Sequence, residues 1–121
     1  MGMELNSIMR QLASDVIITA VEGGIGYWAY CRDYRWDNED DGVTRVDILD
    51  RLSGEDSVDA EWHVVDVQRM AEALERLKPS DNRRLFLAWA HAKCGEDEFD
   101  YDCLDADVAM QLCVLRKVIY G

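Results

Sequence analysis

The sequence predicts an α+β domain in which helices cover one face of a three-stranded antiparallel sheet. Apolar residues recur at three- and four-residue steps near the start of the chain and again through its second half, a pattern typical of amphipathic helices. Between these parts, three runs of alternating apolar and polar residues are joined by acidic turns, which is typical of an antiparallel meander. Since such a sheet is apolar on one face only, it needs a helical layer to bury that face.

A helix is predicted from Asn6 to Val21. Asn6 or Ser7 can cap its start, because a short polar side chain accepts hydrogen bonds from the free amides of the first turn. Gly23 and Gly24 are expected to end it, one of them in the left-handed conformation that closes many helices. The apolar stripe consists of Ile8, Met9, Leu12, Ala13, Val16, Ile17 and Ala20.

Three strands are predicted next, over 27–36, 43–52 and 57–65, separated by turns at 37–42 and 53–56. The first strand places most of its aromatic residues on one face, where they could stack bases or simply join the core. These residues are Trp28, Tyr30, Tyr34 and Trp36, with Arg32 among them. On the third strand, Val58, Ala60, Trp62 and Val64 alternate with Asp59, Glu61 and His63, which form the polar face.

Three helices are predicted in the second half. The first is capped by Asp66 and ends at Pro79, and the second is capped by Ser80 and closed by Gly95. The third starts at Asp105 and carries two cations in its final turn, the favourable end for positive charge on a helix dipole. The residues expected to face inward are Met70, Leu74, Leu77, Leu85, Phe86, Trp89, Ala92, Val108, Leu112, Leu115 and Ile119, and the two cations are Arg116 and Lys117.

Length and composition indicate a single domain spanning 1–121. A chain of 121 residues with 49% apolar residues can bury a core of its own, and it contains neither repeats nor a linker. No stretch is long and apolar enough for a membrane span, and the N-terminus lacks the basic and apolar regions of a signal peptide. A cytoplasmic protein without membrane contact is therefore expected.

The cysteines and histidines form no recognisable metal or catalytic motif. No pair has the spacing of zinc ligands, and without a secretion signal the thiols are expected to stay reduced. No serine or cysteine stands in a nucleophile context near either histidine. We therefore expect no metal, no cofactor and no enzymatic activity. The residues concerned are Cys31, Cys94, Cys103, Cys113, His63 and His91.

The charge is strongly negative and unevenly distributed. The formal net charge is −12. Residues 37–61 hold ten acids against two arginines, and residues 96–107 hold seven acids and no base. Such a field repels nucleic acid phosphates and attracts basic partners, although a run of charge can also serve solubility alone. Direct binding of nucleic acid is therefore not expected.

The junction between the first helix and the first strand is a candidate ligand site. Glu22 stands there beside a run of glycines, followed by Tyr27 and Trp28. A carboxylate held at a rigid turn against two rings could act as a general base or bind a cation or an amine. Alternatively, the turn is purely structural, with Glu22 accepting hydrogen bonds from backbone amides and Trp28 buried in the core.

Two stretches resemble small uncharacterised proteins of bacteriophage and prophage genomes. One runs from Thr19 to Trp28 and contains the motif T-A-x-E-G-G-x-x-Y-W. The other lies near the C-terminus and consists of Asp105, Ala106, Asp107, Gln111, Tyr120 and Gly121. The resemblance covers only the two ends of the chain. It implies an origin in a phage or mobile element, with no known activity to carry over, and a small acidic accessory factor of the kind that inhibits host or defence proteins.

The function predicted first is therefore binding rather than catalysis. The acidic segments 37–41, 55–61 and 96–107 would form a docking face for a basic, nucleic-acid-binding host or defence protein, which this chain would inhibit by imitating the charge of nucleic acid. The carboxylates expected to contact the partner are Asp37, Glu39, Asp40, Asp41, Glu96, Asp97, Glu98 and Asp100.

Two alternatives remain open. The first is a small-ligand-binding protein or enzyme with a pocket at Glu22, Tyr27 and Trp28. The second concerns assembly, because an exposed Trp36 or Trp62 beside an open sheet edge could form a homodimer contact.

Overall fold

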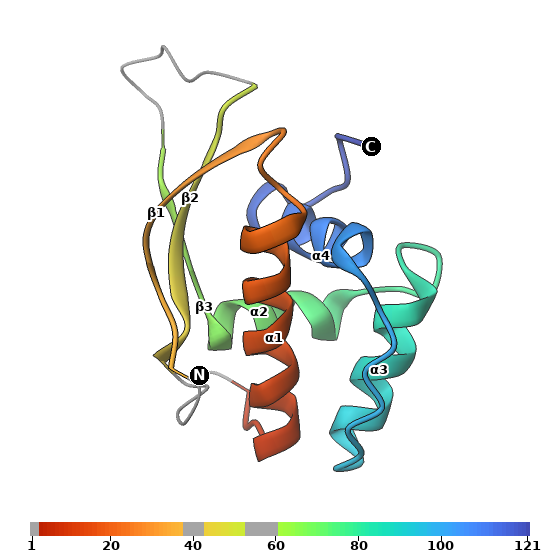
Figure 1. Cartoon of the computed structure of the whole chain (residues 1–121). Helices are drawn as coiled ribbons and strands as arrows, with labels where there is room; N and C mark the ends of the chain where they lie inside the picture. The colour runs from red at the N-terminus through yellow and green to blue at the C-terminus, as the bar shows by residue number, and fades with distance from the viewer. Residues whose placement is uncertain (1–2, 38–42, 53–60) are drawn as a thin grey trace.

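The computed structural model describes residues 3–37, 43–52 and 61–121. The predicted fold class is confirmed, with an N-terminal helix, three antiparallel strands in one sheet and then three helices (Figure 1). The elements are α1 (Ser7–Gly23), β1 (Ala29–Arg35), β2 (Arg45–Asp50), β3 (His63–Asp66), α2 (Val67–Arg76), α3 (Arg83–Lys93) and α4 (Cys103–Leu115).

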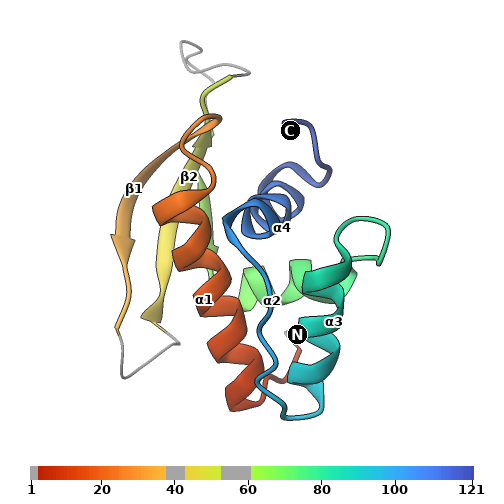
Figure 2. The same ribbon diagram turned by 45° about the vertical axis from the view of Figure 1, so that its right-hand side comes forward.

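The sheet has the strand order β1-β2-β3, with both neighbouring pairs antiparallel. Tyr30 lies opposite Leu49 in the first pair, and Val46 lies opposite Val65 in the second. Figures 1 and 2 show the helices gathered on one side of the sheet, with α1 nearest to it. One face of the sheet is therefore covered by helices, as the one-sided strand pattern requires.

The core forms where α1 lies between the sheet and the other helices. Leu12, Val16 and Ile17 of α1 are completely buried, and so are Val46 and Ile48 of β2. Complete burial of an aliphatic side chain of this size stabilises the fold by about 1.5–3 kcal/mol relative to leaving it exposed. The apolar stripe predicted for the first helix is therefore the centre of the core.

Two predicted helix starts are confirmed. The side chain of Asn6 caps α1 by accepting a hydrogen bond from the amide of Met9 at 2.8 Å. Asp66 caps α2 in the same way, with the amide of Arg69 at 2.8 Å. Gly95 closes α3 in the left-handed conformation, with φ of 79°.

Two other starts were predicted at the wrong residue. Asn82, not Ser80, caps α3 by accepting from the amide of Leu85 at 2.9 Å. Asp102, not Asp105, caps α4, and its carboxylate accepts a hydrogen bond from the amide of Asp105. Asp105 occupies the third helical position, and its own carboxylate accepts a hydrogen bond from the amide of Asp102. This reciprocal arrangement is a capping box, which places the acidic partner one turn inside the helix.

The end of α1 also differs from the prediction. Gly24 follows the helix with φ of −121°, so neither of the two adjacent glycines is left-handed. A Cβ atom at Gly24 would lie 2.7 Å from the carbonyl oxygen of Cys103. The glycine is therefore required by the close approach of α4 to this turn.

The buried face of α4 is not the predicted one. Val108, Leu112 and Leu115 are only half-buried, and Ile119 lies beyond the helix and is exposed. The helix ends at Leu115, so Arg116 and Lys117 follow it rather than form its last turn. The face that packs inward includes two polar residues, which a search for apolar periodicity passes over. It consists of Ala106, Asp107, Ala109, Met110, Gln111, Cys113 and Val114.

The strands differ from the prediction in which way their side chains face. Val65 is completely buried and Val64 is 39% exposed, so the two faces of β3 are exchanged relative to the predicted alternation. A shift of one residue has this effect because side chains alternate along a strand. Residues 57–60 of the predicted strand lie outside the described part of the chain.

The aromatic residues of the first strand do not share one face. An irregularity in the pairing between Arg32 and Arg35, with Asp33 at φ of 52°, turns Tyr34 towards α1. Trp28 precedes β1 and is completely buried. Trp36 is exposed, and Trp62 lies beneath the guanidinium of Arg32. Phe86, predicted to face inward from α3, is exposed.

Candidate functional site

The two stretches singled out at the ends of the chain meet at a buried carboxylate. Asp107 of α4 is only 6% exposed and accepts hydrogen bonds from the hydroxyl of Tyr27 at 2.5 Å and the indole of Trp28 at 2.7 Å. The side-chain amide of Gln111 donates a third bond, at 3.0 Å. A buried carboxylate without hydrogen bonds would be strongly destabilising, and these three donors satisfy it.

Gln111 extends the cluster to the C-terminal residues. Its side chain accepts from the amides of Ile119 and Tyr120 at 2.8 and 2.9 Å and donates to the carbonyl oxygen of Tyr120 at 2.8 Å. The ring of Tyr120 stacks on Trp28 with centroids 5.8 Å apart, and its hydroxyl bonds Asp50 of β2. The cluster therefore joins the turn after α1, helix α4, strand β2 and the C-terminal segment.

Tyr27 is held as the neutral phenol. Desolvation, followed by the hydrogen bond to the carboxylate of Asp107 and its negative charge, raises the pKa of Tyr27 from 10.0 to about 12. The hydroxyl therefore serves as a hydrogen-bond donor to Asp107 over the whole physiological range. This role is structural, because the bond anchors the turn to α4.

Glu22 has a different partner from the two rings predicted beside it. Its carboxylate is exposed and accepts a hydrogen bond from the hydroxyl of Tyr34 at 2.8 Å. Burial, together with Glu22, raises the pKa of Tyr34. Of the three residues predicted as a ligand site, the structure therefore brings Tyr27 and Trp28 together on Asp107, whereas Glu22 pairs with Tyr34 of β1.

The predicted partner-binding residues of the second acidic segment lie on the surface. Glu96, Asp97, Glu98 and Asp100 are all exposed, in the non-helical stretch between α3 and α4. Of the first segment, Asp37 is exposed, and the other predicted residues (Glu39, Asp40 and Asp41) lie outside the described part of the chain.

Part of the second segment is engaged within the protein, contrary to its prediction as one open face. Arg84 of α3 lies 3.0 Å from Asp100, 3.6 Å from Asp102 and 3.3 Å from Asp105. Asp107 is buried in the cluster described above. The exposed carboxylates with the fewest partners therefore lie near the start of the second acidic segment, at Glu96, Asp97 and Glu98. Of these, Glu96 lies 3.6 Å from His91.

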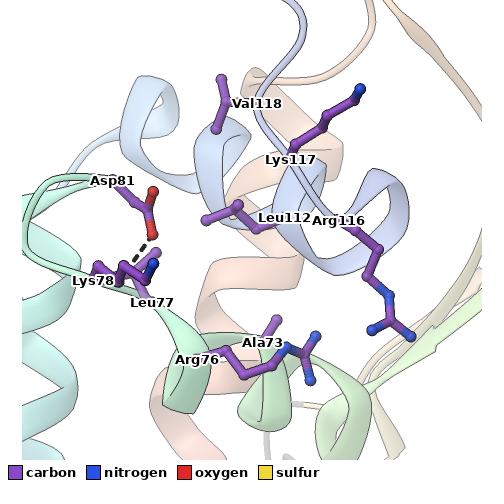
Figure 3. Close-up of a pocket in the computed structure, with 9 residues that line it drawn as sticks. All are labelled: Ala73, Arg76, Leu77, Lys78, Asp81, Leu112, Arg116, Lys117 and Val118. Carbon is purple, nitrogen blue, oxygen red and sulfur yellow. Dashed lines mark hydrogen bonds between the residues drawn. The ribbon is translucent and has the colours of Figure 1, made fainter.

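A basic cavity was missed by the sequence analysis. It has a volume of about 450 Å³ and lies between the end of α2, the loop before α3 and the end of α4 (Figure 3). Its two halves are far apart in the sequence, and the only signal was a concentration of cations in an otherwise acidic chain. We name it the α2–α4 cavity, lined by Ala73, Arg76, Leu77, Lys78, Asp81, Leu112, Arg116, Lys117 and Val118.

The histidines and cysteines of the described residues belong to no cluster that could hold a metal ion. No set of three or more metal-ligating side chains occurs within 3–37, 43–52 and 61–121. The four cysteines are free thiols, and burial raises the pKa of Cys113 to about 11, so it is a protonated core residue.

Comparison of the chain with protein-family models, curated proteins and solved structures finds no match. No helix in the described part of the chain has the length and apolar character needed to cross a membrane. The function is therefore inferred from the geometry and charge of this chain alone.

Proposed function

We propose that this protein is a binding protein of the phage accessory type, which docks on a basic, nucleic-acid-binding host or defence protein in the bacterial cytoplasm and inhibits it. The proposal depends on the exposure of Asp97 and Glu98 and on their lack of side-chain partners. Both are exposed, and no ion pair or side-chain hydrogen bond joins their carboxylates to any described residue. They are therefore available to the cations of a partner.

The segment that carries these carboxylates is anchored on both sides, since the amide of Glu96 donates to the carbonyl oxygen of His91 at 2.9 Å before them and residues 99–101 contact the rest of the protein after them. The hydroxyl of Tyr101 bonds Asp15 of α1, and the ring of Phe99 packs against the core. Arg84 holds the backbone and the carboxylate of Asp100 at 3.2 and 3.0 Å. Because the backbone is fixed in this way, the exposed carboxylates can meet a partner without a large loss of chain entropy.

The electrostatics favour fast and salt-sensitive association. Exposed charges attract an oppositely charged surface over about 10 Å at moderate salt, and this attraction raises the rate of encounter. Residues 96–102 hold five acids and no base, and although Asp100 and Asp102 pair with Arg84, Asp97 and Glu98 present their negative charge to the solvent. A groove that normally receives nucleic acid phosphates would accept these carboxylates.

The test uses two variants with equal changes in charge. Asp97→Lys/Glu98→Lys reverses the two available carboxylates, and the control Glu4→Lys/Glu72→Lys reverses two carboxylates outside the three acidic segments. Each protein is immobilised, exposed to bacterial lysate at low salt and washed with high salt. We expect wild type and the control to retain the same basic nucleic-acid-binding protein and to release it at high salt, and the Asp97→Lys/Glu98→Lys variant to lose it. Equal retention by both variants would refute the proposal.

A further inference from the structure

The α2–α4 cavity concentrates positive charge in an acidic protein. Four of the 13 lysines and arginines line it, whereas the chain as a whole has a net charge of −12. None of these four side chains takes part in an ion pair or a side-chain hydrogen bond with any described residue. Like charges held together repel, and a bound anion would offset that repulsion. The four cations are Arg76, Lys78, Arg116 and Lys117.

The single acid of the lining is already engaged. The carboxylate of Asp81 accepts a hydrogen bond from the backbone amide of Lys78 at 2.9 Å, which fixes the loop between α2 and α3. Figure 3 shows this bond at one side of the cavity, with the guanidinium groups of Arg76 and Arg116 at the other. Lys117 points away from the other cations, so Arg76 and Arg116, whose guanidinium groups lie on the same side, are the cations that we assign to an anion.

The remaining lining selects the organic part of the ligand. Ala73 and Leu77 are buried, and Leu112 and Val118 complete an apolar wall. Among the described residues that line the cavity, none carries an uncharged polar side chain. A ligand body made mainly of hydroxyl groups would therefore lose hydrogen bonds to water without replacement, whereas an aromatic ring can place its apolar faces on this wall.

Arg116 is held in an unfavourable conformation at the edge of the cavity. It has φ of 68°, in the left-handed region where glycine is favoured at a helix end. Backbone strain at a residue with a charged side chain is common in binding sites, where it positions the side chain for the ligand. Replacing this residue by glycine should therefore relieve strain and remove a ligand contact at once.

From these observations we infer that the α2–α4 cavity binds phosphate monoesters with an aromatic or heteroaromatic body, a class that includes nucleoside monophosphates. The planar guanidinium groups of Arg76 and Arg116 match the oxygens of a phosphate group, and the apolar wall receives the ring. A volume of about 450 Å³ is within the range of cavities that hold small organic ligands. This inference does not depend on the proposed function.

The first experiment compares three anions by calorimetric titration of the wild-type protein. Adenosine monophosphate, glycerol phosphate and inorganic phosphate share the anionic group and differ in the body attached to it. We expect adenosine monophosphate to bind at least about tenfold more tightly than the other two, because only its ring uses the apolar wall. Equal affinities, or no binding of adenosine monophosphate at millimolar concentration, would overturn the inference.

The second experiment assigns the site. Arg76→Gln/Arg116→Gln should weaken adenosine monophosphate binding at least about tenfold, whereas Arg83→Gln, an exposed arginine of α3 outside the cavity, should leave it unchanged. Arg116→Gly should weaken binding without lowering the melting temperature, which separates ligand loss from unfolding. Binding that survives the arginine substitutions, or displacement of the nucleotide by an acidic peptide of residues 94–102 at equal concentration, would overturn the assignment.

Discussion

Gln111 joins the C-terminal segment to the core, and Gln111→Ala tests how much that connection contributes to stability. The side chain is completely buried and takes part in four hydrogen bonds of 3.0 Å or less, three of them to backbone groups of Ile119 and Tyr120 and one to Asp107. A net contribution of about 1 kcal/mol for each bond predicts a loss of about 4 kcal/mol.

The assay is urea unfolding followed by tryptophan fluorescence, with Gln11→Ala as the control. Gln11 is an exposed residue of α1, and its replacement by alanine should change the free energy of unfolding by less than about 0.5 kcal/mol. Trp28, which stacks on Tyr120, should also report the release of the segment by a change in its emission. A loss below about 1 kcal/mol for Gln111→Ala would refute the idea that this residue anchors the segment.

Three further predictions concern the same elements. Gly24→Ala should destabilise the fold by about 1–3 kcal/mol in urea unfolding, because the added Cβ would lie 2.7 Å from the carbonyl oxygen of Cys103. In the control Gly26→Ala, the added Cβ meets no atom within 4 Å, so the free energy of unfolding should be nearly unchanged. Similar losses in the two variants would contradict this packing. Arg116→Gly should raise the free energy of unfolding by up to about 1 kcal/mol, since glycine adopts positive φ without strain, and a loss of stability would refute that view. Wild type should have a higher free energy of unfolding than Tyr27→Phe, and this difference should be fully present below pH 10 and decline as the pH rises through about 12. The reason is that the pKa of Tyr27 is raised from 10.0 to about 12 in the folded protein. A difference that stays constant over this pH range would contradict the link to Asp107.

The fold class could be predicted because strong local patterns determine it. The stripe containing Leu12, Val16 and Ile17 repeats with the helical period, and these three side chains are completely buried. The sequence alone could not predict which face of β3 is buried, because Val64 and Val65 are adjacent and equally apolar. Only their pairing with β2 decides which of them faces the core.

The buried face of α4 was predicted wrongly for another reason. Its inward face carries Asp107 and Gln111, and burial of these polar groups depends on donors and acceptors from the other end of the chain. Tyr27 and Asp107 are 80 residues apart, and no local pattern indicates that they meet. The motif residues were noticed in the sequence, but their contact is a tertiary property.

The two candidate sites also differ in whether a local pattern or a tertiary contact defines them. The exposed carboxylates of Asp97 and Glu98 follow from a local run of charge, so the sequence indicated them directly. The α2–α4 cavity brings Arg76 of α2 together with Arg116, which follows α4, and of these two the sequence indicated only Arg116, as a cation at a helix end. Convergence of distant cations is visible only when α2 and α4 are placed side by side.

Competition with nucleic acid is the measurement that tests the central claim most directly. The basic protein captured from lysate is purified, bound to fluorescent duplex DNA at low salt and titrated with this protein while the fluorescence anisotropy is recorded. We expect wild type and Glu4→Lys/Glu72→Lys to displace the DNA completely, and Asp97→Lys/Glu98→Lys to require at least about tenfold more protein to do so. A ternary complex in which the DNA stays bound would contradict the claim that these carboxylates occupy a nucleic-acid groove.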